Sequence, residues 1–212
     1  MSKPTVNPKG VPMSQALRRE QRNSPLPAPM PAGTIRLLGM DPSVWQRHAS
    51  PWSVYSRLAT LPFLAAAIWS HAVIGPWLAL LAVAAVSVWL YLNPRLFPAP
   101  RRTDTWAARA TFGERIWLNR FTVPIPAEDA KMALVLSAVA ASGFLALLIG
   151  ALANNLLVLL PGLVVTYAGK IAFLDRMAAL YDKMRDAHPL YRFWSVHPDN
   201  DNAVDQAAMP PA

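Results

Sequence analysis

Charged side chains next to long apolar runs are the residues of this sequence that could do chemistry. Lys170, Asp175 and Arg176 lie at the end of the fourth apolar run, and Glu114 and Arg115 lie between the second and third runs. A charge inside or at the edge of a membrane is costly and often marks a functional site. Glu114 and Asp175 are the candidate catalytic residues, because a carboxylate near lipid headgroups can act as a general base.

The basic side chains beside the same runs form a candidate site for an anionic lipid headgroup, since arginine and lysine bind phosphate. If the helix ends meet at one level, these residues converge with Glu114 and Asp175 into one cluster with a positive net charge. The alternative is that each residue lies at its own interface, with lysine extending toward the headgroups. The predicted headgroup-binding residues are Arg47, Arg95, Arg115, Lys170 and Arg176.

Other kinds of chemistry have no support in the sequence. The absence of cysteine excludes disulfides, thiolate catalysis and cysteine-ligated metals. The histidines and carboxylates lack metal-ligand spacing, and no glycine-rich phosphate loop or Gly-x-Ser-x-Gly motif is present. We therefore expect no metal and no cofactor. Transport is disfavoured because the apolar runs contain only scattered serine and threonine near their middles.

The positions of the basic residues predict a membrane topology. The chain is 54% hydrophobic and 15% charged, whereas soluble proteins have about 25% charged residues. All twenty Lys and Arg residues lie outside the turns at 71–77 and 153–155, which carry no charge. Basic segments stay in the cytoplasm. The sequence therefore predicts that both termini and the segment between the two hairpins are cytoplasmic.

The expected fold is all-α, with four transmembrane helices arranged as two hairpins. The helices are expected at residues 54–74, 77–92, 132–152 and 156–174. The second would rise only about 24 Å, against a hydrocarbon core of about 30 Å. A shallow hairpin that enters the membrane without crossing it therefore stays open as an alternative. Arg57 lies one turn inside the first helix and is expected to extend out to the interface.

The segment between the hairpins predicts an amphipathic helix over residues 105–119, capped by Thr103 or Asp104. Tryptophan on one face and arginine on the other are typical of a helix in the headgroup plane. The fourth transmembrane helix is expected to continue into the cytoplasm over residues 175–188. The expected interfacial anchors are Trp52, Trp106, Trp117 and Trp194.

Two further patterns concern helix packing. Ala133, Ser137 and Ala141 recur at helical spacing near Gly143 and Gly150, which is either a close-packing face or the result of a high alanine content. Pro62 should bend the first helix, which a membrane helix tolerates when neighbouring helices or Ser/Thr groups bond the carbonyl that proline leaves free. Both patterns assume helices that pack against each other inside one membrane domain.

The expected domain organisation is one membrane domain between two tails. Residues 1–44 are rich in Pro, Ser, Asn, Gln and Arg, and are expected to form a disordered cytoplasmic tail. Residues 45–194 would form the membrane domain, and residues 195–212 a second disordered tail.

Four segments carry a resemblance to a family of small bacterial inner-membrane proteins of unknown function. They are Arg47-His48-Ala49-Ser50-Pro51-Trp52-Ser53, Asn93-Pro94-Arg95-Leu96-Phe97-Pro98, Gly113-Glu114-Arg115-Ile116-Trp117-Leu118-Asn119-Arg120 and Gly169-Lys170-Ile171-Ala172-Phe173-Leu174-Asp175-Arg176-Met177. The likeness covers roughly residues 45 to 185. It implies location in the bacterial inner membrane, and it implies no activity, cofactor or partner.

Two hypotheses about function follow. The first is a non-enzymatic scaffold or accessory subunit, whose basic and aromatic cytoplasmic face contacts anionic lipid or a partner protein. The second is a membrane enzyme acting on a lipid or isoprenoid headgroup at the inner leaflet. Nucleic acid is not an expected partner, because the basic residues flank membrane segments. A membrane-protein partner or a second copy of the chain stays open.

Overall fold

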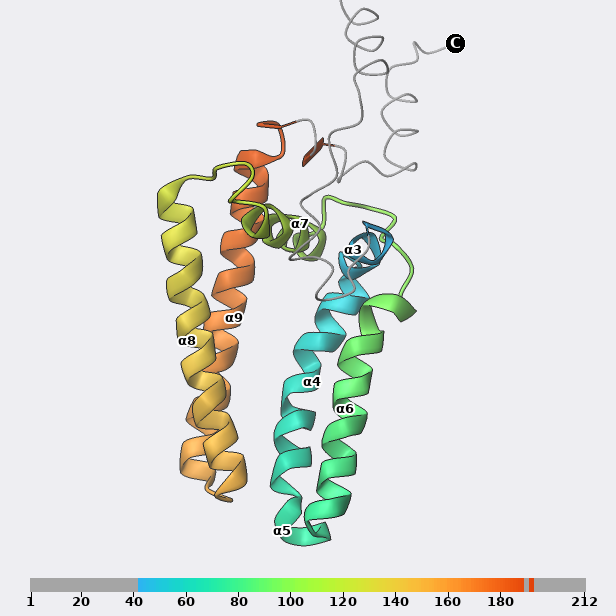
Figure 1. The fold of residues 1–212 in the computed structure, drawn as a ribbon, viewed down its shortest axis with the longest axis vertical. Coiled ribbons are helices and arrows are strands. Elements are labelled where there is room, and N and C mark those ends of the chain that lie inside the picture. The colour runs from blue at the N-terminus through green and yellow to red at the C-terminus, as the bar shows by residue number, and fades with distance from the viewer. Residues whose placement is uncertain (1–41, 189–190, 193–212) are drawn as a thin grey trace, which may run out of the picture. The chain divides into compact units, whose positions relative to one another are not determined.

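The computed structural model describes residues 42–188 and 191–192, in which every element of regular secondary structure is a helix. The predicted all-α class therefore holds for this part of the chain. The helices are α3 (Pro42–His48), α4 (Pro51–Trp69), α5 (His71–Ile74), α6 (Pro76–Leu96), α7 (Trp106–Leu118), α8 (Ala127–Leu152) and α9 (Leu156–Met184), shown in Figure 1.

Four segments are long and apolar enough to cross a membrane, as predicted. They are Pro51–Ile74, Pro76–Leu96, Ala127–Leu152 and Leu156–Met184. Much of their apolar surface faces outward within the described part of the chain; Leu157, for example, is 87% exposed. At most 28% of the residues in the most apolar window of any segment are buried. Such surfaces need an apolar environment to cover them.

The second of these helices is longer than predicted. The prediction ended it at Asn93-Pro94, but α6 begins at Pro76 and continues through Pro94 to Leu96. Its 21 residues rise about 32 Å, which is enough for the hydrocarbon core. The side chain of Asn93 is fully buried and bonded to α4, so this residue lies within the helix instead of ending it. The short length that suggested a shallow hairpin is therefore absent.

Polar side chains join α4 to α6 near the charged end of both helices. Ser53 Oγ donates to Asn93 Oδ1 at 2.8 Å, and Asn93 Nδ2 donates to Ser56 Oγ at 2.8 Å. Further along, Trp89 Nε1 donates to Thr60 Oγ1 at 3.2 Å. Buried polar groups are stabilising only when they are paired, and these pairs fix the register between the two helices.

The α8–α9 pair is held at very short range by glycines. A Cβ added at Gly143 of α8 would lie 2.5 Å from the backbone nitrogen of Thr166, and one at Gly162 of α9 would lie 2.4 Å from that of Leu147. Only glycine permits such an approach of two helix backbones. The small face predicted on α8 is therefore shifted: Ala133 is buried, but Ala141 is exposed and the glycines make the contact.

One side chain of α9 compensates for the proline in α4. Pro62 has no N–H, so it cannot bond the carbonyl of Leu58 four residues earlier. The hydroxyl of Tyr167 donates to this carbonyl at 2.7 Å. At the opposite end of the helices, Asn154 Nδ2 donates to the carbonyl of Trp69 at 3.1 Å. Hydrogen bonds therefore join the two helix pairs at two separate levels.

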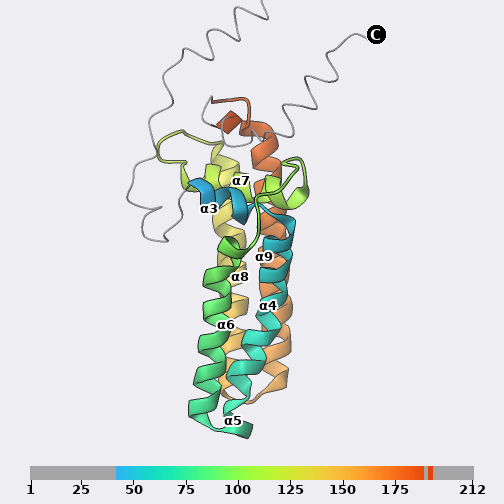
Figure 2. The same cartoon turned by 90° about the vertical axis from the view of Figure 1, so that its right-hand side faces the viewer.

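Helix α7 packs on the charged half of α9, beside the ends of the long helices (Figures 1 and 2). A Cβ at Gly113 would lie 1.8 Å from the carbonyl oxygen of Met177, so the helix backbone rests directly on α9. The cap of α7 differs from the prediction. Thr105, and not Thr103 or Asp104, accepts from the backbone nitrogen of Ala108 with its side chain, because the helix begins one residue after it.

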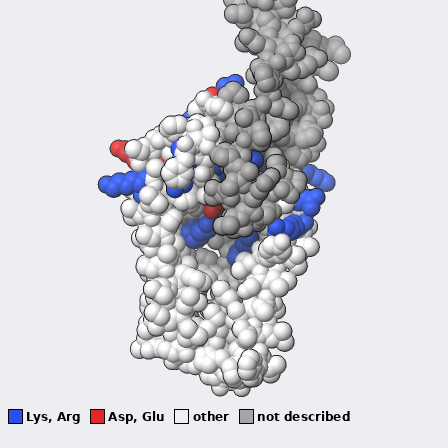
Figure 3. All heavy atoms as spheres, viewed as in Figure 1, with Lys and Arg blue, Asp and Glu red and all other residues white. Residues whose placement is uncertain are grey.

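Charged residues gather at one end of the long helices (Figure 3). No Asp, Glu, Lys or Arg occurs between Arg57 and Arg95, or between Lys131 and Lys170. Helix α9 continues without a break from Leu156 to Met184, joining the predicted transmembrane and extension segments. Helix α3 was not predicted, and most of both expected tails lies outside the described residues.

The bond between Tyr167 and Leu58 can be tested by a double-mutant cycle. Tyr167→Phe leaves a carbonyl without a donor and should destabilise the folded protein by about 1 kcal/mol. In a Pro62→Ala background the restored N–H can bond Leu58, so the same change should cost close to nothing. Unfolding in mixed detergent micelles measures both costs. Equal costs in the two backgrounds would show that Tyr167 does not compensate for the proline.

Candidate functional site

A cavity of about 550 Å³ lies at the charged end of the helices, between the first helix pair and α9. Its walls come from α3, α4, α6, α7 and α9, and none of its lining residues belongs to α8. The polar and aromatic lining residues are Trp45, His48, Arg57, Tyr91, Arg95, Thr111, Glu114, Thr166, Tyr167 and Lys170. The remaining lining residues are apolar: Val54, Leu58, Leu61, Leu90, Pro94, Leu118 and Leu174.

Arg57 is held in the cavity wall by its own helix and by α3. Its Nε donates to the carbonyl of Ser53 at 3.1 Å, and its Nη1 lies 2.7 Å from Nε2 of His48. Among the described residues it makes no ion pair with a carboxylate. The prediction expected Arg57 to extend out to the interface, whereas the structure turns it toward His48 and the cavity.

His48 is neutral because of this environment. Burial, followed by the nearby charges of Arg57 and Lys170, lowers its pKa from 6.5 to about 3. Arg57 Nη1 lies 2.9 Å from Nδ1 and 2.7 Å from Nε2 of this ring. A guanidinium only donates hydrogen bonds, so the ring nitrogen that accepts from it has to be unprotonated. A neutral imidazole supplies such an acceptor, and the contact agrees with the direction of the pKa shift.

Lys170 and Glu114 form the one ion pair among the lining residues. Lys170 Nζ lies 3.6 Å from Glu114 Oε1 and 4.9 Å from the centre of the Phe173 ring. The remaining charged lining residue, Arg95, stacks its guanidinium 4.1 Å from the centre of the Tyr91 ring. With Arg57, the lining has three basic groups and one acidic group, which leaves a positive balance.

The other predicted site residues lie outside this lining. Arg176 Nη2 contacts Asp129 at 2.7 Å, and Asp175 Oδ1 accepts from Trp106 Nε1 at 3.3 Å. Arg47 is exposed and donates to the backbone carbonyl of Arg95 at 3.3 Å. The structure therefore brings together three of the seven predicted residues at the cavity and distributes the others among separate contacts.

Arg115 is the most buried of the predicted basic residues, at 5% exposure. Its guanidinium carbon lies 5.8 Å from the centre of the Trp45 ring. Burial lowers its pKa from 12.5 to about 10, so it keeps its charge near neutral pH. Because Trp45 lines the cavity, Arg115 supports the wall through this ring.

Asp129 is the most enclosed carboxylate in the described residues, with a side chain that is 1% exposed. Arg176 and Lys183 of α9 both contact it, at 2.7 and 3.0 Å. It also lies in the first turn of α8, where the helix dipole favours a negative charge. This triad joins the charged ends of α8 and α9.

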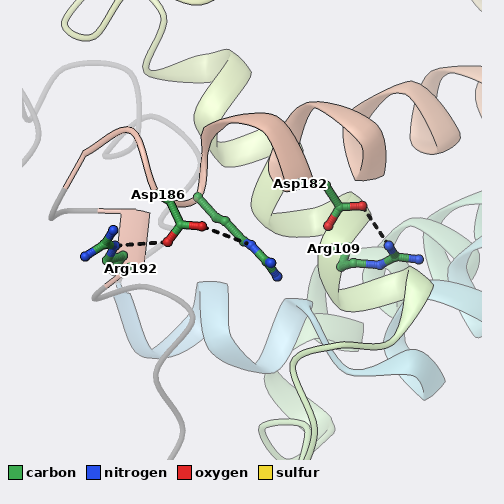
Figure 4. A network of polar contacts seen from close by, with 5 residues as sticks. Arg109, Asp182, Asp186 and Arg192 are labelled. Carbon is green, nitrogen blue, oxygen red and sulfur yellow. Dashed lines mark hydrogen bonds and ion pairs between the residues drawn. The ribbon is translucent and has the colours of Figure 1, made fainter. Parts of the chain in front are cut away.

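Ion pairs also surround the end of α9 (Figure 4). Arg109 of α7 contacts Asp182 at 2.7 Å, and Arg192 contacts Asp186 at 3.0 Å. Tyr191 is fully buried, and its hydroxyl accepts from Asn119 Nδ2 at 3.4 Å. These contacts fold the end of the described chain back onto α7.

The tryptophans predicted as interfacial anchors have different surroundings. Trp52 is exposed, Trp106 stacks on Tyr55 with ring centres 6.3 Å apart, and the Trp117 ring lies nearly perpendicular to the Phe173 ring. Trp194 lies outside the described residues. Contact of these rings with lipid headgroups stays a prediction.

Sequence reasoning missed His48, Arg57 and Trp45 as parts of one site. His48 and Arg57 are nine residues apart across a helix break, so no helical periodicity connects them. The available signal was Arg57 itself, a charge placed inside an apolar helix. Among the described residues, no three His, Asp or Glu side chains are grouped so that they could hold a metal ion.

Comparison with known families places the chain in a family of unknown function (DUF6653), whose model matches residues 31–197. The match covers most of the chain, so the protein belongs to this family, in agreement with the resemblance to an uncharacterised family. No curated protein matches the sequence. No solved structure matches it either.

The neutral state of His48 predicts a dependence of stability on pH. Below about pH 6.5 the unfolded chain gains a proton at this residue, whereas the folded protein gains it only near pH 3. The unfolded state therefore binds more protons in this window, and stability falls with falling pH by up to about 1.4 kcal/mol per pH unit.

His48→Gln should make the pH dependence shallower between pH 7 and 5. His71→Gln, in the uncharged turn at the other end of the helices, is the matched control. Unfolding in detergent at a series of pH values gives the slopes. An unchanged slope in His48→Gln would mean that this histidine is protonated at the same pH in both states.

Proposed function

We propose that this member of a family of unknown function is a non-enzymatic, multi-pass protein of the bacterial inner membrane. Its two helix pairs would be transmembrane hairpins, with both termini and α7 on the cytoplasmic side. There it would serve as a scaffold or accessory subunit, whose basic and aromatic face contacts anionic lipid. The single observation that carries this proposal is the gathering of all charged groups of the four long helices at one end.

The orientation follows from the cost of moving basic residues across a membrane. The charged end contains Arg95, Arg101, Lys131 and the other basic residues that flank the helices, so it should stay in the cytoplasm. Arg101 and Lys131 are exposed and make no ion pair with a described carboxylate. Such groups are available to anionic headgroups, each contributing about 1 kcal/mol near the surface.

The use of the acidic residues supports a structural role over a catalytic one. Asp129 and Asp182 are paired with basic groups on another helix, and Asp175 accepts from Trp106. A carboxylate that holds two helices together cannot change its protonation state without weakening that contact. The scaffold proposal therefore accounts for Asp129, Asp175 and Asp182 as residues that join helices.

One observation favours the second candidate, an enzyme acting on a lipid or isoprenoid headgroup. Glu114 lines the cavity together with Lys170 and the neutral His48, so a carboxylate, an ammonium group and an imidazole lie around one space. General acid–base chemistry needs such groups within reach of the substrate. The scaffold is still preferred, because Glu114 is already paired with Lys170.

Reporter fusions test the proposed orientation. Fusions after Ala72 and after Asn154 should be active only for a periplasmic reporter, whereas fusions after Arg102 and at Ala212 should be active for a cytoplasmic one. The reason is that the first two sites lie at the uncharged end and the third at the charged end. A cytoplasmic signal after Ala72 would contradict the full crossing of the first helix pair.

Lipid profiling separates the two candidate functions. Glu114→Ala should leave the composition of membrane lipids unchanged if the protein is a scaffold, provided that the variant inserts normally. Asp175→Ala, outside the cavity, is the control for general effects of a lost carboxylate. An altered abundance of one lipid class in Glu114→Ala alone would favour the enzyme.

A further inference from the structure

We propose that the cavity between the first helix pair and α9 binds a membrane lipid that ends in a phosphate monoester. The phosphate would lie between Arg57 and Lys170, and the first carbons of the lipid would lie along Leu58, Leu61 and Leu90. This inference rests on the proposed function for the membrane location, and it adds a specific site and a specific chemical class of ligand.

The size and the walls of the cavity fit an amphipathic ligand. Its volume of about 550 Å³ is in the range of small-molecule sites in proteins. Part of the wall is charged, with Arg57, Glu114 and Lys170. Another part is apolar, with Leu58, Leu61 and Leu90. A cavity of this size can hold a lipid headgroup and the first carbons of an acyl or isoprenoid tail. The rest of the tail would lie along the apolar outer faces of the helices.

The charge of the lining selects an anion. The lining contains three basic residues, Arg57, Arg95 and Lys170, and one acidic residue, Glu114. His48 adds no charge to the lining because it is neutral. The lining therefore has a surplus of two positive charges. A phosphate monoester has a charge of about −1.5 to −2 near neutral pH, which balances that surplus more closely than the single charge of a phosphodiester.

One group in the wall lacks the partner that a ligand would supply. Arg57 contacts a carbonyl and a neutral imidazole but no carboxylate in the described residues. A charge at membrane depth is costly unless it is paired. Phosphate oxygens would give the guanidinium an anionic partner.

Lys170 and Arg57 come from different helix pairs, so a bound phosphate would bridge them. Lys170 belongs to α9 and Arg57 to α4. Between them, Tyr167, one turn before Lys170, donates to the carbonyl of Leu58, the residue that follows Arg57. Guanidinium and ammonium groups form strong, charge-assisted hydrogen bonds to phosphate oxygens. The ligand would thus hold the charged ends of the two pairs together.

Native mass spectrometry of the full chain in a mild detergent tests the proposal. The ligands are phosphatidic acid, which is a monoester, phosphatidylglycerol and phosphatidylcholine, which are diesters, and inorganic phosphate in a separate series. We expect one phosphatidic acid per chain, bound at least tenfold more tightly than the other three. If phosphatidylglycerol binds as tightly as phosphatidic acid, the assignment of a phosphate monoester is wrong. Equally tight binding of inorganic phosphate would instead identify a site for the free ion.

Variants locate the bound lipid. Lys170→Gln should weaken phosphatidic acid binding about tenfold or more, because a charge-assisted contact is lost. Glu114→Gln should strengthen it, because the opposing charge is removed. Arg101→Gln is the matched control, since it removes an exposed charge from the same end outside the cavity. Equal weakening in Arg101→Gln and Lys170→Gln would show that binding is only diffuse attraction to the basic end.

A last variant separates the cavity from the surface without changing a charge. Leu90→Trp adds bulk to the apolar wall and should reduce binding about tenfold. Retained binding in this variant would overturn the placement of the lipid chain. Reversed topology in the reporter fusions would contradict the proposed function, whereas loss of specific lipid binding in detergent would contradict only the site.

Discussion

The contact between α8 and α9 at their glycines determines where the other elements can lie. Because Gly143 and Gly162 let the two backbones meet, α9 is fixed along its apolar half. Its charged half, fixed by Asp129 to the start of α8, then forms the surface on which α7 rests. A side chain larger than hydrogen at Gly113 would meet the backbone of Met177, so α7 depends on that same surface.

The cavity follows from this order of packing. The first helix pair is joined to the second by hydrogen bonds, from Tyr167 to Leu58 and from Asn154 to Trp69, and by an apolar cluster in which Ala65 of α4 packs with residues of α8 and α9. The apolar cluster lies away from the charged end, and the cavity lies at that end. Hydrocarbon cannot form hydrogen bonds with charged side chains. A cavity lined by Arg57 and Lys170 would therefore be filled at lower cost by a polar group than by a lipid tail.

Charges have two separate uses at this end of the molecule. Asp129, Arg176 and Lys183 join helices, and Arg109 with Asp182 fixes α7 to α9. Arg57, Arg95 and Lys170 instead face a space with a single carboxylate. The first group joins helices in the charged layer, whereas the second provides the positive balance on which ligand binding would depend.

The four helices of membrane-spanning length, the all-α class and the charge asymmetry were determined by the sequence, because each depends on the local order of apolar and charged residues. Pro62 indicated that a partner was needed for the carbonyl of Leu58, but its identity, Tyr167, lies 109 positions away and came only from packing. The same holds for the site. Glu114 and Lys170 were recognised as candidates, while their pairing, the turn of Arg57 toward His48 and the separation of Asp175 and Arg176 were decided by tertiary structure. Side chains on one helix can lie on opposite faces, and local periodicity does not say which neighbour each face will meet.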